Sequence, residues 1–171
     1  MEKVSSARIA LKWGLIYGVL GIVYNTISYN TGLWKSWAVG LLALFILLFG
    51  VLYMAFNEFK SLNGGFMTFK EGLGLGTLTI TTGGLLSVIF DSFYKKIIDP
   101  SLIEQQMEMI TEQYESMGLS EAQIDEAIQK VEASANSGLS IIWGVLGAVF
   151  FGFIASLIMA AIMKKDKPVF S

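Results

Sequence analysis

The sequence predicts an all-α integral membrane protein: a four-helix bundle with an extramembrane acidic helical hairpin between the third and fourth spans. Three observations predict this fold class. Hydrophobic residues make up 54% of the chain and charged residues only 15%, whereas soluble domains carry roughly 25% charged residues. The apolar residues are concentrated in four charge-free stretches, and most acidic residues lie between the last two of them. We therefore treat all 171 residues as a single membrane domain.

Each of the four stretches is long enough to cross a bilayer as a helix, which takes about 20 residues. The second, WAVGLLALFILLFGVLYMAF, has no polar face, as is typical of a helix surrounded by apolar material. The first is expected to be a retained anchor rather than a signal peptide, because its apolar run is long and no small-residue cleavage site follows. The predicted spans cover approximately residues 9–30, 36–57, 70–94 and 139–163.

The third span contains GLGLGTLTITTGG, residues 72–84, which resembles two other structures locally. Its glycines follow the order G-x-G-x-G, which lacks the spacing and the strand–turn–helix context of a dinucleotide-binding turn. Its alternating threonines resemble a strand, but an isolated strand in lipid would leave its backbone groups unpaired. Thr68 and Glu71 have the spacing of a capping box, which predicts that a membrane helix begins just before the glycines.

The segment between the third and fourth spans is predicted to form a helical hairpin at residues 99–136. The hairpin and its flanks carry nine acidic residues and three lysines. Asp99, with the proline after it, predicts the start of the first helix; Gly118 predicts its end, and Ser120 with Gln123 the start of the second. Each helix has an apolar stripe, which we expect to cover its partner or to lie on the bilayer rim. The stripes are Ile103, Met107, Ile110, Tyr114 and Met117, then Ile124, Ala127, Ile128 and Val131.

The basic residues predict the orientation of the spans. Eight lysines and arginines lie in the N-terminal segment, the loop between spans two and three, and the C-terminal tail, which four spans place on one side. The other side has four lysines. Because cytoplasmic loops are enriched in positive charge, both termini are expected to be cytoplasmic and the hairpin extracytoplasmic.

The order of these parts is similar to that of a known family. NGGFMTFKEG leads into the Gly/Thr-rich third span, which continues through SVIFDSFYKKIIDPSLIEQQMEM to GLSEAQIDEAIQK before the fourth span. The chain resembles the small four-helix bacterial membrane proteins of the domain of unknown function 4199 family, over nearly its whole length and most densely at residues 63–130. The resemblance implies a bacterial cytoplasmic (inner) membrane and the same multi-pass layout. It supplies no catalytic residue, because the family has no established activity.

Small residues form ridges on three of the spans, at the four-residue spacing that lets helices approach closely in lipid. We expect spans one, three and four to pack along these ridges, while span two, which lacks a long ridge, faces lipid. A homodimer face and a substrate path are the alternative uses of the ridges. The candidate packing residues are Gly14, Gly18, Gly72, Gly76, Gly83, Gly144, Ala148, Gly152 and Ser156.

Asp91 is the ionisable group in a span that is most suggestive of function. It continues a small-residue ridge of the third span and is therefore expected to face the bundle. Acidic residues inside spans are costly and often mark ion or proton routes. Asp91 nevertheless lies near the outer boundary, where Lys95 follows at i+4 and Asn25 of the first span is a further candidate partner. A structural contact at the rim and a functional role both remain open.

Several chemistries are excluded by composition. The chain has no histidine and no cysteine, so disulfides, thiolate metal sites and Ser–His or Cys–His catalysis are absent. The acidic hairpin lacks the spacing of a calcium loop. We therefore predict no catalytic, cofactor-binding or metal residues and no cofactor.

The expected role is that of a non-enzymatic accessory, assembly or interaction subunit in the membrane. Its expected partners are membrane lipids, a second copy or a larger membrane complex, and an extracytoplasmic protein bound at the hairpin; no nucleic acid is expected. The alternative is a small transporter, channel or lipid-handling protein that acts as a homo-oligomer. A membrane enzyme for lipid-linked substrates would need rim carboxylates such as Asp91 and Asp99 together, and nothing in the sequence places them so.

Overall fold

The computed structural model describes residues 5–136 and 138–167, with side chains for all of these except residues 134–136. The described residues are almost entirely helical, and they contain no strand longer than one isolated bridge. The elements are α1 (Ser6–Thr31), the 3₁₀ turn η1 (Leu33–Lys35), α2 (Trp37–Leu62), α3 (Phe69–Phe93), the π-helix η2 (Tyr94–Ile98), α4 (Ser101–Ser116), α5 (Glu121–Asn136) and α6 (Leu139–Met163).

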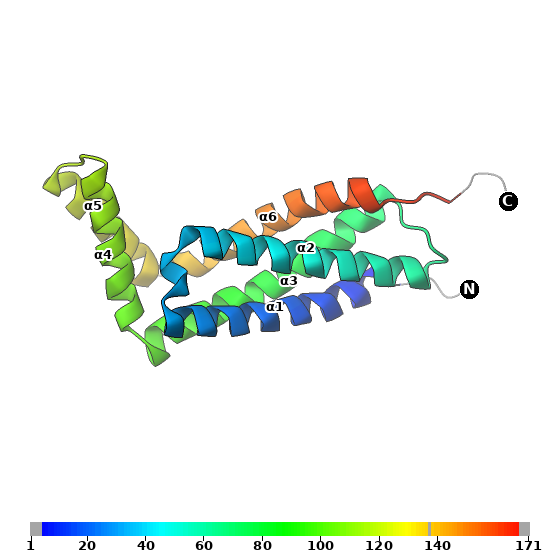
Figure 1. Cartoon of the computed structure of the whole chain (residues 1–171), viewed down its shortest axis with the longest axis horizontal. Coiled ribbons are helices and arrows are strands. Elements are labelled where there is room, and N and C mark those ends of the chain that lie inside the picture. Colours follow the sequence, from blue (N-terminus) through cyan, green and yellow to red (C-terminus); the bar gives the residue numbers. More distant parts are fainter. Residues whose placement is uncertain (1–4, 137, 168–171) are drawn as a thin grey trace.

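The four predicted spans are confirmed as helices long and apolar enough to cross a membrane: α1, α2, α6, and α3 continued by η2. They run side by side, and the start of α1 and the end of α6 lie at the same end of the bundle (Figure 1). The second helix continues to Leu62, beyond the predicted limit at residue 57. Glu58, the charge that limits the predicted span, lies within this helix and pairs with Lys12 of α1.

The Gly/Thr-rich stretch at residues 72–84 is helical, as predicted, and it makes α3 the central helix of the bundle. The capping box is present in both directions: Thr68 N–H donates to Glu71 Oε2 (2.8 Å), and Glu71 N–H donates to Thr68 Oγ1 (3.3 Å). The most extensive interhelical contacts of α3 are with α1 and α6. Small residues permit these helices to approach closely. Close packing is important here because apolar burial gives helices in lipid little drive to associate.

The expectation that span two faces lipid is only half right. The first half of α2 is exposed; Trp37 is 78% and Ile46 63% accessible. Its second half, by contrast, buries Leu52, Ala55 and Phe56 completely against the other helices. These contacts are made mainly by large side chains, so α2 packs without a small-residue ridge.

The end of the bundle that holds the α2–α3 connection is closed by backbone hydrogen bonds. Met67 N–H donates to the Lys165 carbonyl (2.9 Å), and Lys165 N–H donates to the Met67 carbonyl (2.8 Å). The Lys60 ammonium donates to the Met163 carbonyl (3.2 Å) at the C-terminus of α6, where the helix dipole favours a cation. Met67 is fully buried. These contacts join the connection between α2 and α3 to the end of α6.

Helices α4 and α5 form a helix pair (residues 101–136) at the other end of the bundle, where the pair extends away from the four long helices (Figure 1). A turn joins them; Gly118 adopts the left-handed conformation (φ +78°) that glycine tolerates best. The Ser120 N–H donates to Gln123 Oε1 (3.0 Å), which is one of the two bonds of the predicted capping box. The Ser120 hydroxyl donates to the same oxygen (3.1 Å) instead of accepting from the Gln123 N–H. The first helix begins at Ser101, just after the predicted start at Asp99–Pro100. The Asp99 carboxylate does not cap the helix and accepts instead from Ser101 Oγ (2.6 Å).

Candidate functional site

The candidate site lies where α3 ends, and its centre is Asp91. The Lys95 ammonium lies 2.9 Å from Asp91 Oδ2, and the Tyr29 hydroxyl, from α1, donates to Oδ1. Both charged side chains are partly buried, at 20% exposure for Lys95 and 29% for Asp91. The carboxylate is thus neutralised by a cation on its own helical segment and hydrogen-bonded to a neighbouring helix.

Aromatic rings hold this ion pair in place. The Lys95 ammonium lies 5.6 Å from the centroid of the Tyr29 ring, within cation–π range. The Tyr29 and Tyr94 rings have centroids 5.2 Å apart, and the Asn30 amide donates to the Tyr94 hydroxyl (3.0 Å). The last turn of α1 is thereby joined to η2, which carries Tyr94 and Lys95.

The π-helix η2 was not foreseen from the sequence. Its wider turn is closed by the Asp99 N–H, which donates to the Tyr94 carbonyl five residues earlier (2.9 Å). Such single π-turns are rare and frequently occur at functional sites. Tyr94 is buried among Tyr29 and Phe90, and this packing is decided by α1, a helix more than sixty positions earlier in the chain.

The α1 partner of Asp91 is Tyr29, not Asn25. In the described part of the chain Asn25 makes no side-chain hydrogen bond to Asp91, whose contacts are with Tyr29 and Lys95. Tyr29 follows Asn25 by one helical turn and so lies nearer the end of α1, at the height where α3 ends. Tyr29 lies on the same face of α1 as Asn25 and nearer the end of the helix. These two features of the sequence could have identified it as the partner of Asp91.

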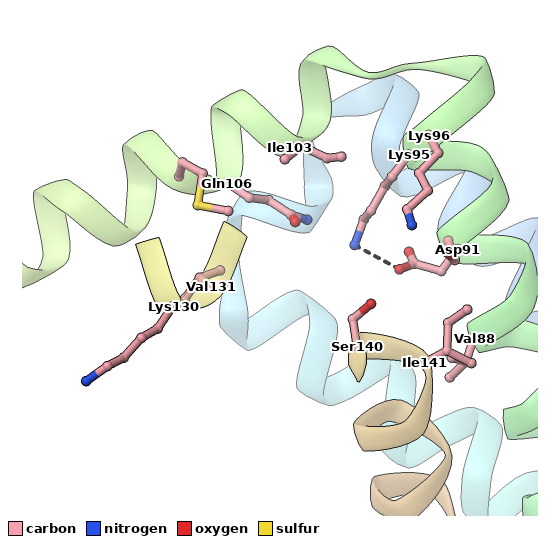
Figure 2. A pocket seen from close by; sticks show the side chains of 12 residues that line it. Val88, Asp91, Lys95, Lys96, Ile103, Gln106, Lys130, Val131, Ser140 and Ile141 are labelled. Atoms are coloured by element: carbon pink, nitrogen blue, oxygen red, sulfur yellow. Dashed lines mark ion pairs between the residues drawn. The ribbon is translucent and has the colours of Figure 1, made fainter. Parts of the chain in front are cut away.

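A cavity of about 390 Å³, here called the Asp91 cavity, opens between this ion pair and the helix pair. Five elements contribute to its wall: α3, η2, α4, α5 and α6. Figure 2 shows Lys95, Lys96 and Asp91 on one side, Gln106 extending toward them from α4, and Ser140 of α6 below them. Lys130 lies at the margin, and its ammonium points away from the lysine pair. Apolar side chains complete the lining: Val88, Ile103, Met107, Val131 and Ile141.

The groups that line the cavity can be compared with the carboxylate pair that a lipid-acting enzyme would need. Among the described lining residues Asp91 is the only one with a carboxylate, and Asp99, which such an enzyme would need beside Asp91, does not line the cavity. No cluster of three or more acidic groups that could hold a metal ion occurs among the described residues. What the cavity presents is a neutralised carboxylate, two ammonium groups, hydroxyl and amide groups, and apolar walls.

The candidate packing residues all lie in two interfaces. Gly14 and Gly18 of α1 face Thr82 and Leu86 of α3, and Gly83 of α3 faces the Gly14 backbone. On the opposite side of α3, small residues of α3 and α6 meet each other or a larger partner. The contacts there are Gly72 with Ala160, Gly76 with Ser156, Gly144 with Val88, Gly152 with Ile80, and Gly84 with Ala148.

Two further glycines in these interfaces were missed from the sequence. A Cβ at Gly84 would lie 2.5 Å from Ala148 Cβ, and one at Gly21 would lie 2.6 Å from Ser87 Oγ. Gly84 directly follows Gly83, and neighbouring residues of a helix point in different directions. A pair of adjacent glycines in a central helix was the signal that both of its sides are closely packed.

A polar contact at the opposite end of the bundle was also missed. The Glu58 carboxylate of α2 accepts from Trp13 Nε1 (2.8 Å) and pairs with Lys12, both on α1. The Lys12 ammonium in turn lies 5.2 Å from the centroid of the Trp13 ring. Both ends of the bundle thus have a carboxylate that pairs with a lysine and accepts a hydrogen bond from an aromatic side chain of α1.

Four long apolar helices and a polar site at the end of the bundle define the class of this molecule, a multi-pass α-helical membrane protein. The chain belongs to the family described as protein of unknown function, DUF4199, whose model matches residues 12–165. This confirms the resemblance noted in the sequence. No curated protein and no solved structure matches the chain.

Proposed function

We propose that the protein is a non-enzymatic accessory or assembly subunit of a bacterial cytoplasmic membrane, which presents the helix pair as an extracytoplasmic acidic hairpin to a protein partner. One observation carries the proposal: the helix pair extends from the bundle (Figure 1), and the acidic residues of its two helices are exposed. The exposed acidic residues are Glu104, Glu108, Glu112, Glu115, Glu121, Asp125, Glu126 and Glu132.

The charge balance of the helix pair supports a basic partner. Lys130 is the only basic residue of α4 and α5, and its ammonium is already paired with Glu126 (2.6 Å). The remaining carboxylates therefore produce a negative potential that attracts a positively charged surface and speeds its encounter. Each helix of the pair buries one apolar side chain, Leu102 in α4 and Ile124 in α5, while its carboxylates face outward.

The orientation rests on the distribution of basic residues. The side that carries both termini has twice as many lysines and arginines as the side that carries the helix pair, which favours cytoplasmic termini. The partner is then expected in the extracytoplasmic space or on the outer part of a neighbouring membrane protein.

Site-specific photo-crosslinking in native membranes tests this proposal. A photoreactive amino acid at Glu112, on the exposed acidic face, should give a reproducible adduct with one protein, and one at exposed Asp166 in the tail should not. The double variant Glu108→Lys/Glu112→Lys should abolish the adduct from a probe at Glu115, whereas Asp166→Lys, a charge reversal far from the pair, should leave it intact. Absence of any adduct from the helix pair, or an adduct insensitive to the charge reversals, would contradict the proposal.

The alternative, a small transporter, channel or lipid-handling protein acting as a homo-oligomer, is favoured by a different observation. Asp91, an acidic residue within the third spanning segment, lines a cavity. The test is flux or lipid translocation in liposomes that contain the purified protein, with wild type compared with Asp91→Asn. Transport by wild type that Asp91→Asn removes would establish this alternative, and no transport by either would exclude it.

A further inference from the structure

We propose that the Asp91 cavity binds the phosphate of an anionic ligand, with the headgroup of an anionic phospholipid as the form in which the membrane supplies it. The inference does not depend on the protein partner proposed above. The volume of the cavity, about 390 Å³, lies within the range of small-molecule sites, roughly 300–1,000 Å³. Its wall is mostly apolar with a few convergent polar groups, which is the usual composition of such sites.

The first argument is the charge inside the cavity. Asp91 is the only acidic residue among the described residues that line it. Lys95 already neutralises this carboxylate, and Tyr29 donates a hydrogen bond to it. Lys96 has no ion-pair partner in the described part of the chain. It lines the cavity together with Lys95, and Figure 2 shows the two side chains on the same side of it. The cavity therefore retains an uncompensated positive charge, which favours an anion.

The second argument is how η2 places this charge. Lys95 and Lys96 are adjacent, and within the π-turn both side chains extend toward the Asp91 carboxylate (Figure 2). Gln106 and Ser140 face them from α4 and α6 (Figure 2). An amide and a hydroxyl are the uncharged donors that complete the hydrogen bonds to phosphate oxygens.

The third argument is the position of the site relative to lipid. The charge-free part of α3 ends at Phe90, directly before Asp91. Phe93, Ile97 and Ile98 are exposed at the start and the end of the π-turn, so an apolar surface adjoins the two lysines. Such a combination is typical of a segment at the headgroup level of a bilayer. The apolar side chains of the cavity wall, among them Val88 and Ile141, are placed to contact the glycerol and the first acyl carbons of the lipid.

Native mass spectrometry of the delipidated full-length protein, titrated with phosphatidylglycerol and with phosphatidylcholine of identical chains, tests the proposal. We expect wild type to bind phosphatidylglycerol preferentially. Lys96→Gln should weaken that binding about fivefold, the effect of removing one cation worth about 1 kcal/mol near a lipid surface, and Lys96→Arg should retain it. Lys130→Gln is the matched control: it removes the same charge from the cavity margin, where the ammonium points away, and should change affinity less than twofold.

Competition with inorganic phosphate and with glycerol 3-phosphate distinguishes the two sources of the ligand. If neither displaces phosphatidylglycerol, the lipid headgroup is the ligand; if one displaces it at a concentration comparable to the lipid, a free phosphate compound is the ligand.

Equal affinity for the two lipids, or an equal loss of affinity in Lys96→Gln and Lys130→Gln, would overturn the proposal. Lys96 is exposed, so its variants are expected to fold; unchanged helical circular dichroism verifies this. A lipid result of either sign leaves the crosslinking test of the helix pair unaffected.

Discussion

Gly83 of α3 lies so close to Gly14 of α1 that a Cβ at residue 83 would be 2.5 Å from the Gly14 carbonyl oxygen. The obstacle is backbone, which cannot move aside as a flexible side chain can. The two helices thus touch through their main chains, and lateral close packing of this kind is the principal source of helix association in lipid. The contact fixes the height at which α1 meets α3, and with it the height of Tyr29 relative to Asp91.

Gly83→Leu should destabilise the bundle by separating α1 from α3. Overpacking of a filled interior typically costs about 1–3 kcal/mol, and here the backbone contact leaves no room for the side chain. We expect loss of the monodisperse peak in fluorescence-detected size-exclusion chromatography and a lower Tm in detergent. Gly74→Leu is the control on the same helix, because nothing lies within 4 Å of a Cβ there. Equal behaviour of the two variants would contradict the packing described.

Gly152→Leu tests the other side of α3. A Cβ at Gly152 would lie 2.9 Å from Ile80 Cβ, a branch point near the backbone that has little freedom to move. Stable expression in the membrane should fall strongly. Gly147→Leu, also on α6 but with open space around its Cβ, should express as wild type does. Tolerance of leucine at residue 152 would show that α3 and α6 are not held by this interface.

The Asp91–Lys95 pair should contribute a small, measurable amount to stability. Its members are one helical turn apart and partly buried, so a coupling of about 0.5–1 kcal/mol is expected, at the upper end for accessible pairs. A double-mutant cycle of Asp91→Asn and Lys95→Gln, measured by unfolding in detergent or by steric trapping, gives this coupling. Strictly additive effects would show that the two side chains do not interact in solution.

The helix pair carries a pH-dependent contact at its surface. The Lys130 ammonium, by donating to the Glu126 carboxylate and by attracting its charge, holds the pKa of Glu126 below its usual value. The lowered pKa means that the folded state favours ionised Glu126. The stabilisation from this contact is therefore fully present above the ordinary glutamate pKa of about 4.3. It is lost as the pH falls through the lowered value.

NMR titration of the Glu126 carboxyl group checks this assignment. In Lys130→Gln the pKa of Glu126 should rise toward its ordinary value, because both the hydrogen bond and the attraction are removed. An unchanged titration midpoint in that variant would show that Lys130 does not contact Glu126 in solution. No other part of the structure needs to change for the effect to be seen, since both side chains are exposed.

The orientation can be measured directly because the chain contains no cysteine. A single cysteine at Glu112 should react with a membrane-impermeant maleimide added to cells whose outer envelope is permeabilised. One at Asp166 should react only after the cytoplasmic membrane is disrupted. Both positions are exposed, so accessibility of the side chain does not confound the comparison. The reverse pattern would invert the orientation, and labelling of both positions in intact membranes would contradict four spans.

Elements specified by short-range patterns could be predicted well. The four spans follow from runs of apolar residues, and the starts of α3 and α5 follow from caps whose partners are three residues apart. The helical state of residues 72–84 follows from the same local cap and from the backbone's need for hydrogen bonds in lipid. The i+4 spacing also predicted the pairing of Lys95 with Asp91, which the structure confirms. The partners of polar side chains on other helices could not be predicted in this way. Asn25 was a candidate partner of Asp91, but the partner on α1 is Tyr29. No local pattern indicated the contact of Lys12 with Glu58.

The amino-acid sequence by itself therefore determined that this chain forms four membrane-length helices, with an acidic helical segment before the last, because hydropathy and capping act within a few residues. Only the tertiary structure decided that α3 is central, that Tyr29 holds Asp91, that the chain forms a π-turn at Tyr94, and that a lysine-containing cavity results. These features depend on the rotation and height of one helix against another. Such quantities are set by contacts between residues far apart in the chain, as between Gly14 and Gly83, and no local pattern encodes them.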